Sequence, residues 1–217
     1  DAVNSTGGLI VPDFLEELNI EVIKLYCEPN GDFPHNPEPL KKNLTELSKK
    51  VIECNADLGI AVDPDVDRLV FVCEDGELFG EENTLVACAD YVLSKTPGST
   101  VSNLSSSRAL NDITKKHNQV HYYSAVGEVN VVDKMKKCKA VIGGEGNGGV
   151  IYPESHFGRD SIVGIGLFLS LYVERGLIAS KLLETYPKYF MVKEKINLSP
   201  SLDVDNILGQ IAEKYKN

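Results

Sequence analysis

The sequence predicts an α/β protein made of two consecutive layered domains, and three observations support this prediction. Segments with the two-residue period of strands alternate with segments of helical spacing through both halves of the chain. A break rich in proline and glycine, Lys95–Gly98, separates the halves. The 217 residues suffice for one large domain or two small ones with a buried core. We therefore expect domains at residues 1–97 and 98–190, followed by a polar segment, 191–217, that resembles the opening of a further domain.

The first domain is expected to contain three helices, a strand and a hairpin. Apolar side chains recur at helical spacing in three segments, Leu9–Leu18, Asn43–Cys54 and Glu81–Leu93. The apolar pattern of Ile20–Tyr26 predicts a strand. The segment Glu28–Pro39 contains four Pro and one Gly, which excludes a helix or a central strand and predicts a loop.

The second domain continues the alternation of strands and helices and ends in a polar tail. Its predicted strands are Thr100–Leu104, Gln119–Tyr123, Lys139–Ile142 and Val150–Tyr152. Its predicted helices are Ser107–His117, Glu128–Lys137, Asp160–Arg175 and Ala179–Thr185. Asp160 is expected to cap the strongly apolar helix that follows it. Val204–Tyr215 is predicted to form a lone helix in the tail.

The region between residues 58 and 73 is predicted to be a hairpin whose turn is acidic. Leu58–Val62 and Leu69–Cys73 have the alternation of strands. Between them, carboxylates occur at every second residue, at Asp63, Asp65 and Asp67. Carboxylates this close repel one another unless a cation lies among them, and oxygen ligands favour Mg²⁺ or Ca²⁺ over Zn²⁺ or Cu²⁺. The turn is therefore a candidate divalent-metal site.

Arg68 follows the last of these aspartates and can bind a phosphate through two parallel hydrogen bonds.

Two alternative explanations of the acidic turn remain open. Aspartates often form solvated turns without any ion. An EF-hand calcium loop would have Glu74 at its twelfth position, but Arg68 occupies the place of that loop's Gly, and the flanking segments predict strands instead of helices.

A second polar turn is predicted in the glycine-rich stretch Gly143–Gly149. Its glycines allow the backbone to approach a ligand closely. Glu145 and Asn147 offer a carboxylate beside an amide, a pair that suits the vicinal hydroxyls of a sugar, although a solvated hairpin turn is the alternative. The stretch also contains Gly-x-Gly-x-x-Gly, but a strand-like segment follows where a dinucleotide-binding loop would open a helix.

Composition argues against several classes of partner. The chain has 32 acidic and 22 basic side chains, and a net charge of −10 disfavours broad electrostatic binding of nucleic acid or anionic lipid. No apolar run is long enough to span a bilayer, and no secretory signal opens the chain. The five Cys are scattered and odd in number, which favours reduced thiols in a cytoplasmic protein.

The two polar turns together resemble those of the α-D-phosphohexomutase family. Asp63–Arg68 resembles the family's magnesium loop, Asp-Gly-Asp-Gly-Asp-Arg, and Gly144–Gly149 resembles its sugar-binding loop, Gly-Glu-x-Ser-Gly-His. The turn at Asp1–Gly8 and the helix start at Arg159–Asp160 extend the resemblance over nearly the whole chain. It implies the second and third of four domains, each a three-layer α/β/α unit around a mixed four-stranded sheet, without the first and fourth domains.

The resemblance also implies an activity. Members of this family are isomerases, intramolecular phosphotransferases that interconvert hexose 1-phosphates and hexose 6-phosphates through a phosphoserine and a bisphosphate intermediate. The phosphoserine belongs to the first domain, so the isolated chain is expected to be inactive. The implied site residues are Asp63, Asp65 and Asp67 for Mg²⁺, Arg68 for the phosphoryl oxygens, and Glu145 and Asn147 for the hexose phosphate substrate.

Several positions depart from the family pattern. Asn147 stands where many members have Ser, and Gly149 where many have His. The turn Ser124–Gly127 lacks a Lys that some members carry. Pro34–Pro37 imitates the phosphoserine motif without its Ser and is predicted to be structural. The preferred sugar is therefore open, with phosphoglucosamine mutase as an alternative to phosphoglucomutase and phosphomannomutase. A metal- or nucleotide-binding module without enzymatic activity, or a silent scaffold, is the alternative outside this chemistry.

Overall fold

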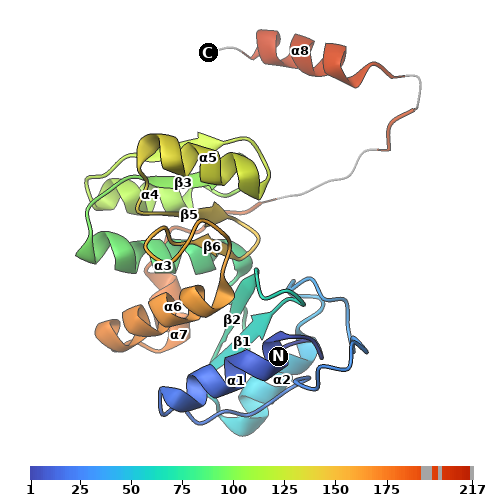
Figure 1. The fold of residues 1–217 in the computed structure, drawn as a ribbon, viewed down its shortest axis with the longest axis vertical. Coiled ribbons are helices and arrows are strands. Elements are labelled where there is room, and N and C mark those ends of the chain that lie inside the picture. Colours follow the sequence, from blue (N-terminus) through green and yellow to red (C-terminus); the bar gives the residue numbers. More distant parts are fainter. Residues whose placement is uncertain (192–196, 200–201, 216–217) are drawn as a thin grey trace.

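The computed structural model describes residues 1–191, 197–199 and 202–215, and its elements form two neighbouring groups with a separate last helix (Figure 1). The first group contains α1 (Gly7–Glu17), α2 (Thr45–Cys54), β1 (Leu58–Val62) and β2 (Leu69–Cys73). The helices of the second group are α3 (Glu81–Lys95), α4 (Ala109–Lys116), α5 (Glu128–Cys138), α6 (Ser161–Arg175) and α7 (Ala179–Glu184). Its strands are β3 (Thr100–Asn103), β4 (His121–Ser124), β5 (Ile142–Glu145) and β6 (Gly149–Ile151). The separate helix, α8 (Val204–Lys214), has no buried residue.

The second group is built around a mixed four-stranded sheet in the order β4-β3-β5-β6. β3 pairs in parallel with β4 and β5, and β6 returns antiparallel to β5. Alternate side chains divide between the two faces: Val101 and Ile151 pack in one apolar cluster with α5, whereas Ile142 and Val150 belong to another with α3 and α4. This arrangement gives the three layers that the sequence predicts.

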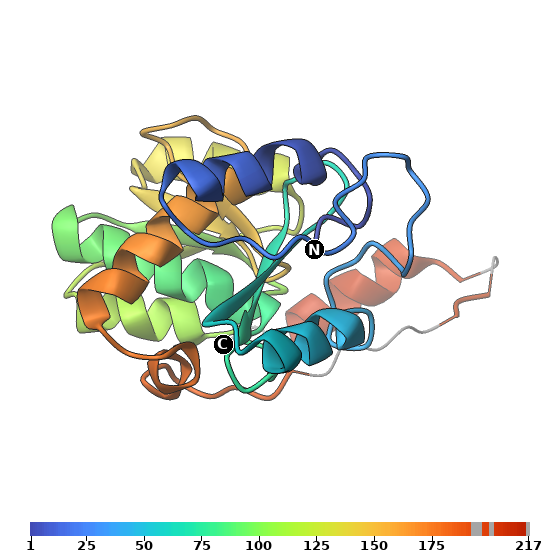
Figure 2. The same ribbon diagram turned by 90° about the horizontal axis from the view of Figure 1, so that it is seen from below.

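The β1–β2 hairpin is the structural centre of the first group. Figure 2 shows it between α1 and α2. All five residues of β2 are buried, because the strand is packed on both faces. On one face, the Phe71 ring stacks on Phe168 of α6 at 3.7 Å between centroids, and Phe79 meets Phe168 edge-on at 5.1 Å. The acidic turn is therefore carried by a rigid strand whose core continues into the second group.

The sheet of the first group is smaller than expected. The α/β class and the two α/β/α units are confirmed, but only β1 and β2 pair as regular strands there, so the prediction of four strands in this domain is wrong in the described structure. Ile20–Tyr26 was likewise predicted to be a strand and is irregular. It accepts hydrogen bonds at Leu25 and Tyr26 from Ala2 and Asn4. Val3, Asn4 and Tyr26 all have positive φ, which interrupts a regular ladder.

Helix α3 joins the two groups. It packs against α6, α4 and β5, and it also contacts β2 of the hairpin. The domain limits 1–97, 98–190 and 191–217 stay predictions. Two smaller predictions can be checked directly. The Asp160 carboxylate caps α6 by accepting the Val163 N–H at 3.0 Å, and His35 of the Pro34–Pro37 segment binds the Asp1 carboxylate at 2.9 Å, a structural contact.

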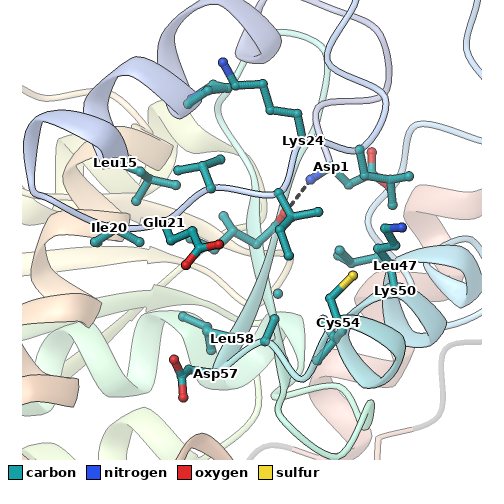
Figure 3. Close-up of a pocket in the computed structure, with 18 of the residues that line it drawn as sticks. Asp1, Leu15, Ile20, Glu21, Lys24, Leu47, Lys50, Cys54, Asp57 and Leu58 are labelled. Atoms are coloured by element: carbon teal, nitrogen blue, oxygen red, sulfur yellow. Dashed lines mark hydrogen bonds between the residues drawn. The ribbon is translucent and has the colours of Figure 1, made fainter.

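An apolar cavity of about 420 Å³ opens beside β1 (Figure 3). It is lined by α1, α2, β1 and the irregular segment, with Leu15, Leu47 and Leu58 on its wall. The Asp1 backbone nitrogen donates a hydrogen bond to the Ile60 carbonyl at 2.7 Å at one end. None of the residues predicted to bind metal, phosphate or sugar lines this cavity.

Every helix in the described residues is too short or too polar to traverse a lipid bilayer.

His121 on β4 predicts a measurable pH dependence of stability. Its Nδ1 lies 2.7 Å from the Thr100 hydroxyl and its Nε2 3.1 Å from the Ser102 hydroxyl. Burial, with a contribution from Lys115, lowers the pKa of His121 to about 4 from 6.5. The unfolded chain therefore binds more protons between these two values, and the free energy of unfolding should fall by about 2 kcal/mol as the pH drops through that window.

The measurement is urea unfolding at pH 7 and at pH 4.5 for the wild type and for His121→Gln. Glutamine keeps a side chain able to hydrogen-bond but does not titrate, so the variant should lose much of the decrease in stability on acidification. The same decrease in both proteins would contradict the assignment.

Candidate active site

The acidic turn holds its three carboxylates close together. Ligand oxygens of Asp63, Asp65 and Asp67 all lie within 4.8 Å of one another. Asp63 is buried, Asp65 is exposed and Asp67 is intermediate. The Asp63 Oδ1 fixes the turn by accepting hydrogen bonds from the Asp67 and Arg68 backbone N–H groups at 3.0 and 2.9 Å. The structure thus brings together the three residues predicted to bind a metal.

The electrostatics of this turn fit a divalent cation. The pKa of Asp63 is raised to about 7, mainly because the carboxyl is buried and also because Asp67 and Asp65 are close. A cation among the carboxylates would offset both effects. An all-oxygen donor set with anionic charge is the set that Mg²⁺ and Ca²⁺ prefer, so the residues present fit such an ion.

Contacts from outside the hairpin hold the shape of the turn. The hydroxyls of Ser5 and Thr6 donate hydrogen bonds to the Pro64 carbonyl at 3.0 and 2.6 Å. The Val66 carbonyl accepts the Ser161 N–H, the first of α6, at 3.0 Å. Val66 has φ +60°, which is unfavourable for a β-branched residue by about 1–2 kcal/mol. The position therefore suits the Gly that the phosphohexomutase magnesium loop carries there.

Arg68 lies over the acidic turn. Its Nε is 3.7 Å from the Asp63 Oδ2 and 3.9 Å from the Asp67 Oδ1. Its Nη1 is 3.5 Å from a carboxylate oxygen of Glu38, on the proline-rich loop. The Arg68 side chain is 31% exposed, so its guanidinium can reach an anion placed at the turn.

Glu145 ends β5 and is surrounded by donors. Its Oε1 accepts hydrogen bonds from the Asn103 side-chain amide at 2.6 Å and from the Gly127 N–H at 3.3 Å. Its Oε2 accepts from Arg159 Nη1 at 2.9 Å. The side chain is only 7% exposed. Glu145 is thus a fixed acceptor at the carboxyl end of the parallel strands, where α/β sheets bind ligands.

The glycine-rich stretch is tighter than expected, because Gly143–Glu145 belongs to β5 and Gly149 begins β6. Only residues 146–148 form the turn, so the prediction of a loop from Gly143 to Gly149 is corrected to a hairpin. The Asn147 Oδ1 accepts the Gly149 N–H at 3.2 Å. The Gly148 carbonyl accepts the Leu69 N–H at 3.0 Å. The glycine turn therefore rests directly on the first residue of β2.

Arg159 connects the two turns. Its guanidinium pairs with Asp67 through Nη2 and with Glu145 through Nη1, the latter at 2.9 Å. Its Nε lies 3.4 Å from the Glu128 Oε2, and its backbone N–H donates to the Glu128 Oε1 at 3.0 Å. Arg159 thus brings Glu145 of the glycine turn close to the acidic turn that carries Asp67. Whether they perform those roles stays a prediction.

Sequence reasoning missed several members of this site. Asn103, which holds Glu145, ends a parallel strand, and the carboxyl ends of such strands are where functional side chains collect. The Ser106 hydroxyl accepts the Gly146 N–H at 2.8 Å, and it lies in the serine run after that strand. Asn103 and Ser106 could have been predicted as site residues from the order of the parallel strands. Arg159 was noted only at a helix start, because nothing in its neighbours along the chain indicates a partner 92 residues away.

Two of the alternatives, the EF-hand loop and the dinucleotide-binding loop, lack their structural context. The acidic turn joins strands β1 and β2, whereas an EF-hand loop joins helices. The glycine turn joins strands β5 and β6, whereas a dinucleotide-binding loop opens a helix. The described geometry therefore argues against an EF-hand loop and a dinucleotide-binding loop, while the metal and sugar roles stay predictions beside solvated turns.

Two family models match the chain. The model described as phosphoglucomutase/phosphomannomutase, alpha/beta/alpha domain II, matches residues 1–76, and the model for domain III matches residues 81–189. A phosphoglucomutase/phosphomannomutase of Thermococcus kodakarensis is 34% identical over 215 residues, covering 98% of this chain and 47% of that protein. A probable phosphoglucosamine mutase of Methanopyrus kandleri is 34% identical over 204 residues, covering 93% of this chain and 45% of that protein.

Among solved structures, a phosphoglucomutase/phosphomannomutase family protein from Burkholderia thailandensis superposes with a TM-score of 0.78. It is 27% identical, and the match covers 87% of this chain and 42% of that one. The chain therefore spans about half the length of the curated relatives that it matches.

Proposed function

Because the chain belongs to the phosphoglucomutase/phosphomannomutase family, we propose that it forms the metal-binding and sugar-binding core of a phosphohexomutase. The full-length protein would interconvert a hexose 1-phosphate and a hexose 6-phosphate. The observation that carries this proposal is the meeting of the two turns: Arg159 contacts both Asp67 of the acidic turn and Glu145 of the glycine turn. A phosphoryl group bound at one turn would therefore lie next to a sugar bound at the other.

The proposed residue roles follow from the geometry. The three aspartates would hold Mg²⁺, which neutralises charge on a transferring phosphoryl group when it is bound. Arg68 would bind phosphoryl oxygens, since its guanidinium faces the turn and is partly exposed. Glu145 would accept a sugar hydroxyl as a fixed carboxylate, and Asn147 would add an amide. The phosphoserine would come from a domain outside this chain.

Neither the relatives nor the residues of the two turns identify the preferred sugar. Relatives at similar identity include a phosphoglucomutase/phosphomannomutase and a probable phosphoglucosamine mutase. The side chains of Asn147 and Gly149 differ from the family's usual Ser and His, so neither turn favours one sugar. A cytoplasmic location and the absence of a nucleic-acid partner stay predictions from composition.

The test is an assay of the full-length protein with glucose 1-phosphate, mannose 1-phosphate and glucosamine 1-phosphate. Each assay includes a hexose bisphosphate activator and is run with Mg²⁺ and with EDTA. Turnover of at least one sugar that depends on Mg²⁺ is expected, and the 217-residue chain alone should be inactive. No turnover with any of the three would contradict the proposal, and tight binding of NAD or Ca²⁺ instead would favour a binding module without enzymatic activity.

A further inference from the structure

Arg159 lies between the two turns, and the proposed function gives it no role of its own. It precedes the N-cap of α6, and its side chain is 14% exposed. Three carboxylates surround the guanidinium, from Asp67, Glu145 and Glu128. A single arginine thus neutralises charge from the hairpin turn, from the end of β5 and from the start of α5. Removing it would leave buried or half-buried carboxylates without their cation.

The absence of a side chain at position 149 makes room for this arginine. A Cβ built on Gly149 would lie 2.4 Å from the Arg159 Cδ and 3.1 Å from its Cγ. These contacts are shorter than carbon atoms tolerate, so a side chain at position 149 and the observed Arg159 conformation exclude each other. Position 149 is where the phosphohexomutase sugar loop typically carries His. The Arg159 stem therefore fills the space that this His would enter.

Asp67 is shared between two cations. Arg159 pairs with its Oδ2, and Arg68 Nε lies 3.9 Å from its Oδ1. A metal ion held by the aspartate turn has to compete with the Arg159 guanidinium for Asp67, and the guanidinium also repels the ion. Glu145, unlike Asp67, would not be drawn to the metal ion. Its three donors hold the carboxylate in one position, where it could accept a hydrogen bond from a sugar hydroxyl.

We propose that Arg159 is a positioning residue that takes the place of a side chain at position 149, fixes Glu145 for the sugar, and competes with the metal ion for Asp67. This inference rests on the proposed phosphohexomutase function. Two opposite effects follow from it. Loss of Arg159 should strengthen metal binding, because Asp67 is released and a repelling charge is removed. The same loss should weaken binding of the sugar phosphate, because Glu145 loses a fixed partner and the site loses a cation.

The experiment uses the full-length protein with Arg159→Gln and, as a matched control, Arg175→Gln. Arg175 also pairs with a carboxylate, Asp90 at 2.9 Å, but it lies at the end of α6, outside the site. Mn²⁺ binding without sugar is measured by electron paramagnetic resonance, and kcat and KM are measured for the hexose 1-phosphate that the wild type turns over. Arg159→Gln should bind Mn²⁺ about threefold to tenfold more tightly and show a KM about tenfold higher. Arg175→Gln should change neither quantity.

Three outcomes would overturn the inference: unchanged Mn²⁺ affinity in Arg159→Gln, weaker Mn²⁺ binding, or an unchanged KM. A wild type without activity on any hexose phosphate would contradict the proposed function, while the Mn²⁺ titration would still test the competition for Asp67.

A second pair of variants keeps the inference testable if Arg159→Gln folds poorly. Gly149→His alone should lower the thermal midpoint because of its clash with the Arg159 stem, and adding Arg159→Ala should restore part of that loss. Additive destabilisation by the two changes would show that the two side chains do not compete for one space.

Discussion

Replacing Asp65 by asparagine in the full-length protein is expected to lower kcat by roughly a hundredfold to a thousandfold, the largest effect that we predict. Asp65 is the exposed member of the aspartate trio, and its carboxylate makes no side-chain hydrogen bond in the described structure. The substitution therefore removes one charge from the predicted metal site with little cost to folding. Most of the effect should come from weaker binding of Mg²⁺ and weaker stabilisation of the transferring phosphoryl group.

The measurement is a Mg²⁺ titration of activity, compared with the unfolding midpoint of the same protein. Asp75→Asn is the matched control, because Asp75 is also an exposed aspartate in a turn at the other end of β2. Its Oδ1 accepts the Glu77 N–H, a role that asparagine can keep. If Asp65→Asn retained full activity with an unchanged Mg²⁺ requirement, the acidic turn would not be a catalytic metal site.

Replacing Gly148 by alanine is expected to destabilise the fold by about 2–4 kcal/mol, the largest stability effect that we predict. Gly148 has φ +93°, and a Cβ there would lie 2.5 Å from the Leu69 carbonyl oxygen and 2.9 Å from the Leu69 nitrogen. Both neighbours are backbone atoms, so no side chain can move aside. The change should also break the hydrogen bond from the Leu69 N–H to the Gly148 carbonyl and separate the glycine turn from the β1–β2 hairpin.

Urea unfolding measures this effect, and Gly166→Ala is the matched control. Gly166 lies within α6, where a Cβ would meet only the Phe14 Cζ at 3.9 Å. Alanine there should leave stability unchanged or raise it by about 0.5–1 kcal/mol. Equal stabilities for Gly148→Ala and the wild type would mean that the glycine turn is not held against β2.

The parts of the site that follow from local sequence could be predicted, and the acidic turn is the clearest case. Alternation in Leu58–Val62 and Leu69–Cys73 specifies two strands, and a hairpin between them places Asp63, Asp65 and Asp67 together without further information. Glu145 could be predicted as an exposed turn acceptor, but the structure buries it, because three donors from separate segments converge on it.

What could not be predicted depends on contacts between distant segments. Arg159 and Asp67 are 92 positions apart, and they meet because α6 packs against β2 and the Ser161 N–H binds the Val66 carbonyl. Ile20–Tyr26 has the composition of a strand, but its neighbouring backbone at Val3 and Asn4 adopts positive φ, and no local pattern indicates that. The strand β5 was placed too early because its glycines were read as loop residues, whereas they allow β5 and β6 to approach closely: a Cβ on Gly144 would lie 2.0 Å from the Gly149 carbonyl oxygen.

The shared core around Phe71 and Phe168 has a consequence for motion. Because β2 of the first group and α6 of the second are packed into one aromatic stack, the two groups cannot hinge relative to each other without separating buried rings. The distance between the three aspartates and Glu145 should therefore stay constant for as long as this stack remains intact. If the proposed function is correct, any opening and closing movement would arise in parts of the protein other than these two groups.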